Sequence, residues 1–160
     1  MRGRGIGGIR RDTGCHKDGV ERGMDMSNRA SDWLKQAEYD LQHARNALKD
    51  EDFEWACFAA QQSAEKAVKA LFFSLGGEGW GHSITRLLAD LTQKLSVPDV
   101  LFSASKHLDK HYIPTRYPNG FDAGVPRDYY TKDEARKAIE DAVAIYDFCH
   151  QYVHRSGGGH

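Results

Sequence analysis

The residues best suited to chemistry in this 160-residue chain lie in the segment "HYIPTRYPNGFDAGVPRDYY", residues 111–130. Arg116 carries a planar guanidinium with five donors, which suits a phosphate or a carboxylate. The segment also contains four tyrosines: Tyr112, Tyr117, Tyr129 and Tyr130. Tyrosine rings can stack on nucleobases or anchor a protein interface. Arg116 and these tyrosines are therefore candidate ligand-binding residues; alternatively, Arg116 pairs with a carboxylate and the tyrosines seal the core.

Two lysines of the segment 53–75 are further candidates for ligand binding. Lys66 and Lys69 interrupt a strongly apolar pattern, together with Gln62. Side chains three and four residues apart lie on one face of a helix. This polar face either forms the local pairs Gln62/Lys66 and Glu65/Lys69 or turns toward a groove or a partner. In the second case, the lysines add positive charge near Arg116.

Two histidines precede the tyrosine-rich segment at a spacing that metal sites use. His107 and His111 are four residues apart, so their imidazoles share a helix face. Asp109 lies between them, but no third ligand follows by spacing. We therefore expect no metal site. The sequence also contains no nucleophile motif, no phosphate-binding glycine loop and no sign of a cofactor.

The elements that position these residues are predicted to be helices. Apolar residues recur every three to four positions in most of the chain. The predicted helices span residues 31–49, 53–75, 83–95, 98–111 and 131–153. Prolines and glycines exclude a long helix from residues 112–130. We therefore predict an all-α, up-and-down bundle of four to five helices with a Pro/Tyr-rich loop before the last long helix.

Composition and the chain ends limit the class of protein. Residues 1–27 and 154–160 lack periodicity and are expected to be disordered tails around a domain at 28–153. The net charge of −1 gives no general preference for nucleic acid. Cys57 and Cys149 lie in apolar helical patterns and are expected to be buried and reduced. With no run of apolar residues long enough for a membrane span, a cytoplasmic protein is expected.

Five blocks of the sequence together resemble the HEPN-domain family. The blocks are "WLKQAEYDL", "FEWACFAAQQSAEKAVKALFFSLG", "GHSITRLL", "HLDKHYIPTRYPN" and "PRDYYTKDEARKAIEDAVAIYDF". The resemblance covers about residues 31–150. It implies a compact bundle that self-associates, often encoded beside a minimal nucleotidyltransferase in a two-component or toxin–antitoxin system. It also implies nucleotide binding in some members and RNase activity in many.

The RNase members of that family carry an arginine followed, after four to six residues, by a histidine. Arg116 stands in a comparable place, but the positions four to seven residues after it hold Gly120, Phe121, Asp122 and Ala123. RNA cleavage needs an acid or base as well as a cation. The missing histidine therefore favours binding over cleavage.

Three hypotheses follow. In the first, the chain is a module that binds nucleotide or RNA phosphate and pairs with a minimal nucleotidyltransferase, itself forming a homodimer. In the second, it is a metal-independent RNase toxin that uses Arg116 with His111 or His107. In the third, it is a structural dimer without a ligand. Lys66 and Lys69 contribute only to the first.

Overall fold

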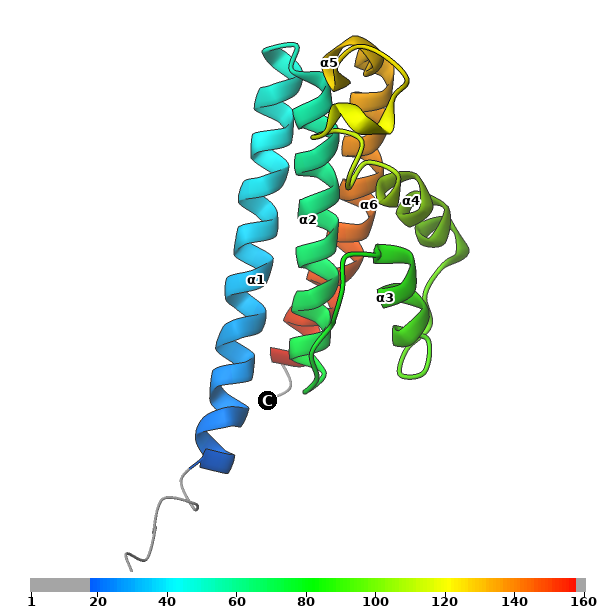
Figure 1. Ribbon diagram of the computed structural model, residues 1–160. Coiled ribbons are helices and arrows are strands. Elements are labelled where there is room, and N and C mark those ends of the chain that lie inside the picture. The colour runs from blue at the N-terminus through cyan, green and yellow to red at the C-terminus, as the bar shows by residue number, and fades with distance from the viewer. Residues whose placement is uncertain (1–17, 158–160) are drawn as a thin grey trace, which may run out of the picture.

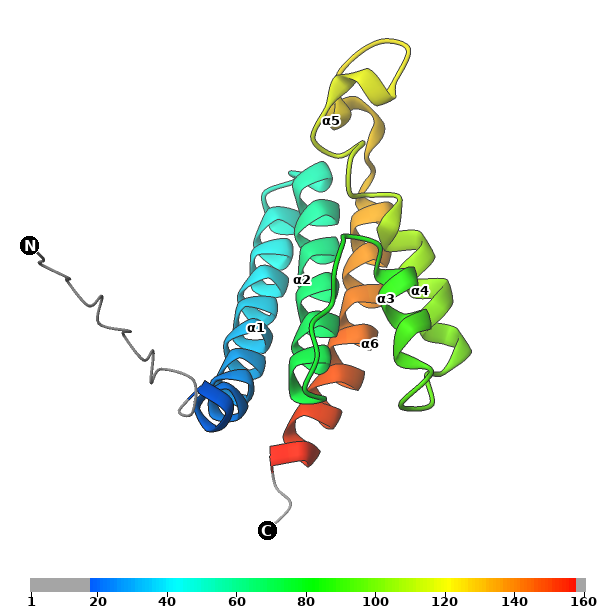
Figure 2. The same ribbon diagram turned by 60° about the horizontal axis from the view of Figure 1, so that its bottom comes forward.

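The computed structural model describes residues 18–157, and all regular elements in that range are helices (Figure 1). The elements are α1 (Asp18–Lys49), α2 (Phe53–Ser74), α3 (Ile84–Leu91), α4 (Asp99–Asp109), a 3-10 helix η1 (Pro118–Gly120), α5 (Pro126–Tyr129) and α6 (Lys132–Gly157). The predicted all-α bundle is thus confirmed. Three long helices, α1, α2 and α6, lie side by side; of the shorter pair, α4 packs against α6, and α3 packs against α4 and α2 (Figures 1 and 2).

The helix bounds differ from the predicted ones mainly at the chain ends. The first helix begins at Asp18 instead of near residue 31, and the last ends at Gly157 instead of near 153. A formed helix gains one hydrogen bond for each residue added, so it can extend beyond the residues whose apolar spacing predicted it. Of the expected tails, 1–27 and 154–160, residues 1–17 and 158–160 lie outside the described residues.

Helix α2 forms the centre of the bundle. It packs against both α1 and α6, and its alanines are buried on several sides, among them Ala56, Ala60, Ala64 and Ala67. Alanine lets neighbouring helices approach closely, while the larger Leu71 and Val68 fill the interior. The predicted burial of Cys57 and Cys149 is confirmed, and both are free thiols.

The start of α3 is fastened to the end of α4 by Asp109. Its carboxylate accepts hydrogen bonds from Ile84 N (2.8 Å), Thr85 N (3.1 Å) and Ser83 Oγ (3.1 Å). Ser83 Oγ in turn accepts from Arg86 N and caps α3. These bonds satisfy backbone donors that a helix start leaves without partners. They fix the position of residue 83 relative to α4.

The loop at residues 112–130 is ordered by its own contacts and by links to the bundle. Phe121 stacks on Tyr129 with ring centroids 4.1 Å apart, and the Tyr129 hydroxyl donates to Ala123 O. Arg127 Nη1 lies 2.6 Å from Asp52 Oδ1, which ties the loop to the α1–α2 connection. The loop therefore keeps a defined shape although it contains only η1 and α5.

No helix within residues 18–157 combines the length and the apolar character needed to cross a membrane.

Candidate functional site

Arg116 is held among aromatic rings at the surface of the bundle. Its guanidinium carbon lies 4.4 Å from the Phe58 ring centroid, 4.7 Å from that of Tyr112 and 5.2 Å from that of Tyr117. Arg116 Nε and Nη2 both donate to Tyr112 O, at 2.9 and 2.5 Å. In the described part of the chain, no carboxylate forms an ion pair with Arg116. The alternative in which a carboxylate of the bundle neutralises Arg116 is thus not what the structure shows.

The rings around Arg116 continue in both directions. We call Trp55, Phe58, Tyr112, Tyr117 and His82, together with Arg116, the aromatic strip. Trp55 meets Phe58 edge to face at 6.1 Å, and His82 stacks on Tyr112 at 4.5 Å with an interplanar angle of 19°. Trp55 and Tyr117 are each 48% exposed. A row of exposed π-faces around an unneutralised cation suits stacked bases and a phosphate.

His82 is one of three members of the strip, with Trp55 and Phe58, that the sequence analysis did not single out. Its Nδ1 lies 2.9 Å from Glu65 Oε1, and Glu65 is only 4% exposed on α2. Lys69 Nζ lies 3.6 Å from Glu65 Oε2. The signal in the sequence was a histidine immediately before the cap residue Ser83, but its partner Glu65 is 17 residues away, beyond any local pattern.

Lys66 and Lys69 lie in ion pairs, unlike Arg116. The predicted pair of Lys69 with Glu65 is present, and Lys69 Nζ also lies 5.8 Å from the Trp33 ring centroid. Lys66 Nζ pairs with Asp40 on α1 instead of with Gln62. Lys66 therefore pairs with α1, and Lys69 is linked to His82 of the strip through their shared partner Glu65.

The other two loop tyrosines lie apart from Arg116. Tyr129 stacks on Phe121 and is 44% exposed. Tyr130 is half-buried, with its ring edge-to-face against His111 at 5.6 Å, and burial raises the pKa of its phenol to about 12. Their contacts hold the loop together. Of the four tyrosines, Tyr112 and Tyr117 are the two that the structure brings to Arg116.

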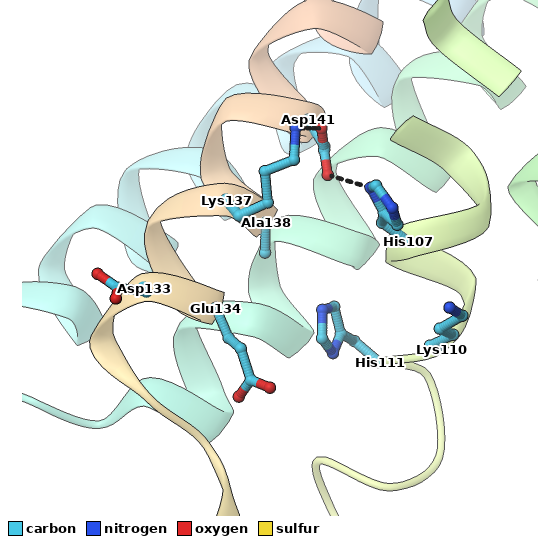
Figure 3. Close-up of a pocket in the computed structure, with 8 residues that line it drawn as sticks. All are labelled: His107, Lys110, His111, Asp133, Glu134, Lys137, Ala138 and Asp141. Atoms are coloured by element: carbon cyan, nitrogen blue, oxygen red, sulfur yellow. Dashed lines mark ion pairs between the residues drawn. The ribbon is translucent and has the colours of Figure 1, made fainter. Parts of the chain in front are cut away.

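His107 and His111 line a separate pocket of about 350 Å³ between the end of α4 and the start of α6 (Figure 3). Asp141 Oδ2 lies 3.4 Å from His107 Nδ1, and Lys137 Nζ lies 3.0 Å from Asp141 Oδ1. Burial lowers the pKa of His111, although nearby Glu134 opposes this shift. No hydrogen bond or ring contact in the described residues joins His111 to Arg116, so the structure does not bring this predicted pair together.

The structure adds nothing in favour of a metal at this pocket. Within residues 18–157, no group of three or more histidine, cysteine, aspartate or glutamate side chains is arranged to hold a metal ion.

Comparisons with known proteins agree with this fold. A family model described as "HEPN domain" matches residues 30–152. The crystal structure of TT1696 from Thermus thermophilus is 50% identical, with a TM-score of 0.76, and the match covers 78% of this chain and 98% of that chain. The crystal structure of ST0689, "an archaeal HEPN homologue", is 41% identical with a TM-score of 0.68, again over 78% and 98% of the two chains.

A more distant relative carries a functional name. The protein of Methanocaldococcus jannaschii named "Putative toxin MJ1304" is 24% identical over 135 residues, which cover 79% of this chain and 89% of the relative.

Proposed function

Because the chain belongs to the HEPN-domain family, we propose that it binds nucleotides or single-stranded RNA on the aromatic strip, with Arg116 as the phosphate contact. A fold alone does not define a function, so the proposal depends on the site. The observation that carries it is the state of Arg116. Its guanidinium is positioned by two bonds to Tyr112 O and by three rings, yet no described carboxylate neutralises it.

Single-strand binders combine these same features. Bases stack on aromatic side chains irrespective of sequence, and a nearby cation follows the phosphate backbone. Arginine also retains its attraction to phosphate while it is stacked on rings, because its charge is delocalised over a plane. Three rings of the strip are exposed, those of Trp55, Tyr117 and His82, and these offer surface on which a base can stack.

A binding titration tests the proposal. Fluorescence anisotropy with a short single-stranded RNA, and thermal shift with ATP and GTP, are measured on wild type, Arg116→Ala and Arg155→Ala. Arg155 is an exposed arginine at the far end of α6 and serves as the matched control. We expect Arg116→Ala to weaken RNA binding. The slope of the logarithm of the binding constant against the logarithm of salt concentration should fall in magnitude by about 1, since one phosphate contact is lost. Equal RNA affinity of the two variants would show that Arg116 is not part of the binding site. No binding by wild type would favour a structural dimer without a ligand.

The proposed biological setting is a two-component or toxin–antitoxin system with a minimal nucleotidyltransferase as the partner. It is supported by the family and by the name of the M. jannaschii relative. Co-expression with a minimal nucleotidyltransferase from the same genome, followed by affinity capture of the tagged chain, tests the partner. Failure to co-purify at micromolar concentrations would count against it.

Self-association is proposed on exposed apolar side chains outside the aromatic strip. Tyr39, Trp80 and Ile113 are exposed and belong to no ligand contact proposed above. Aromatic residues of this kind are enriched in protein interfaces. Light scattering should give a particle of twice the 18.0 kDa chain mass; a monomer at high concentration would refute the homodimer.

RNase activity is a second candidate, favoured by the resemblance to a family with many RNases and by a histidine in the strip. His82 contacts Tyr112, the ring that Arg116 also contacts, whereas His111 lies in the other pocket. Metal-free cleavage of RNA by the purified chain, lost in both Arg116→Ala and His82→Ala, would support it. Intact RNA after prolonged incubation would exclude it.

A further inference from the structure

The pocket between α4 and α6 contains a buried carboxylate oxygen without a hydrogen bond. Asp141 is 5% exposed, and Lys137 Nζ lies 3.0 Å from its Oδ1. The other oxygen, Oδ2, lies 3.4 Å from His107 Nδ1, which is longer than an ordinary N–H···O bond. Within residues 18–157, Oδ2 has no hydrogen-bond partner. Because a buried polar atom is costly unless a partner reaches it, the pocket offers an acceptor suited to a ligand donor.

A second buried polar atom without a hydrogen bond lines the same pocket. In the described part of the chain, His111 Nδ1 has no hydrogen-bond partner. Burial lowers the pKa of His111, so its imidazole is neutral at pH 7 and keeps a lone pair on one nitrogen. A donor that approaches Nδ1 selects the tautomer with the proton on Nε2. Both buried atoms therefore suit a ligand that brings N–H donors.

The wall that α6 contributes to the pocket is apolar between two acidic side chains. Glu134 and Asp141 are seven residues apart, about 10 Å along the helix, and both extend toward α4 (Figure 3). Ala138 lies between them and is 1% exposed. Its methyl group provides a floor for an aliphatic chain, and the pocket volume of about 350 Å³ admits several methylene groups.

The acidic and basic residues that line the pocket leave one negative charge in excess. The carboxylates are those of Asp133, Glu134 and Asp141, whereas the ammonium groups are those of Lys110 and Lys137. One added positive charge would balance this lining, but a phosphate or a carboxylate would add to the excess. Lys137 also shows that an ammonium group on a four-carbon chain binds Asp141.

We propose that this pocket binds a primary ammonium group on a short aliphatic chain, with Asp141 Oδ2 as the anchor. An ammonium group carries three donors and no acceptor, which matches the buried atoms of the pocket. Its bond to a carboxylate is charge-assisted and therefore among the stronger hydrogen bonds. The group belongs either to a free alkylamine or to a lysine side chain of another protein. The site lies apart from the aromatic strip, so the inference does not depend on the proposed function.

Four small probes test the inference in amide NMR titrations at about pH 8, where an ordinary imidazole is neutral. The probes are butylamine, butanol, butyltrimethylammonium and Nα-acetyl-lysine N-methylamide. Butanol keeps the chain without the charge, and butyltrimethylammonium keeps the charge without an N–H donor. The lysine amide imitates a lysine residue of a protein. The proteins are wild type, Asp141→Asn and the control Asp147→Asn, which changes an exposed aspartate of α6 outside the pocket.

Wild type and Asp147→Asn should bind butylamine with a Kd on the order of 1 mM, as expected for so small a ligand. The amide shifts should be confined to the end of α4 and the first half of α6. Asp141→Asn should bind butylamine about ten- to hundredfold more weakly, because a charge-assisted hydrogen bond is lost. Butanol and butyltrimethylammonium should not bind measurably at the same concentrations.

The lysine amide identifies the source of the ammonium group. Binding as tight as that of butylamine would assign the pocket to a lysine side chain of another protein, and no binding would assign it to free alkylamines. Three results would overturn the inference: no binding of butylamine by wild type, equal binding of butanol, or unchanged affinity in Asp141→Asn. Shifts in wild type that spread outside the pocket would also overturn it, and this readout does not require Asp141→Asn to fold.

Discussion

Asp109 should contribute more to stability than any other exposed or half-buried polar residue of the α3–α4 pair. Its carboxylate accepts two backbone N–H groups and one hydroxyl at 2.8–3.1 Å. A hydrogen bond to a charged group contributes roughly 1.5–3 kcal/mol when it is buried, and less where water can replace it. Ile84 is fully buried whereas Ser83 is exposed. The hydrogen bond from Ile84 N should therefore contribute nearly its full free energy to stability, and the bond from Ser83 Oγ should contribute little. We expect Asp109→Ala to cost about 3 kcal/mol.

Chemical denaturation monitored by circular dichroism measures that cost. In a domain of this size, about 3 kcal/mol corresponds to a decrease in Tm of roughly 10 °C. Asp109→Asn keeps one acceptor oxygen and should lose about half as much. Asp90→Ala on α3 is the control, because no hydrogen bond or ion pair of its side chain is found among residues 18–157, and it should stay within about 0.5 kcal/mol of wild type. A loss below about 1 kcal/mol for Asp109→Ala would show that water replaces the carboxylate and would refute the reasoning.

Three further predictions concern the loop, a histidine and the thiols. Gly79→Ala should destabilise the fold by about 1–3 kcal/mol and weaken RNA binding, because the added Cβ would meet Phe72 and shift the loop that carries His82. Gly77→Ala is the control in both the denaturation and the binding measurement, because its Cβ would meet only a backbone oxygen at 3.8 Å. Burial lowers the pKa of His111, so the unfolded state takes up a proton that the folded state does not as pH falls below about 6.5, and unfolding becomes easier. The Tm of His111→Phe should therefore decrease less than the Tm of wild type when the pH is lowered from about 7.5 to 5.5. The same decrease in both proteins would contradict this. Burial, assisted by Glu134 and Glu54, raises the pKa of the Cys57 thiol to about 12, and burial also raises the pKa of the Cys149 thiol. Iodoacetamide should therefore alkylate neither thiol in the native protein and both in denaturant, as measured by site-resolved mass spectrometry.

Local sequence signals predicted the local structure well. Thr131 and Glu134 form a capping box, with Thr131 N 3.0 Å from Glu134 Oε2 and Glu134 N 3.2 Å from Thr131 Oγ1. Such a motif depends only on residues three apart, so no tertiary information is needed to find it. The apolar spacing located all five longer helices for the same reason.

The composition of the site depended on tertiary contacts and was only partly predictable. Tyr112 and Tyr117 could be named as neighbours of Arg116 because they are close to it in the sequence. Phe58 and His82 could not, because they come to Arg116 and Tyr112 from distant segments. Lys66 was assigned to a local pair or a groove, but its partner on α1 lies 26 residues earlier.

Helix α2 carries both supports of the aromatic strip, and this arrangement separates two properties of a ligand site. Phe58 and Glu65 are seven residues apart on one straight element, which corresponds to about 10 Å along its axis. Arg116 and Tyr112 come from the loop and are hydrogen-bonded to one another. For the proposed ligand, the helix therefore sets the length that fits, and the loop sets how long it stays bound. Variation in the loop can change residence time while the span of the site stays constant.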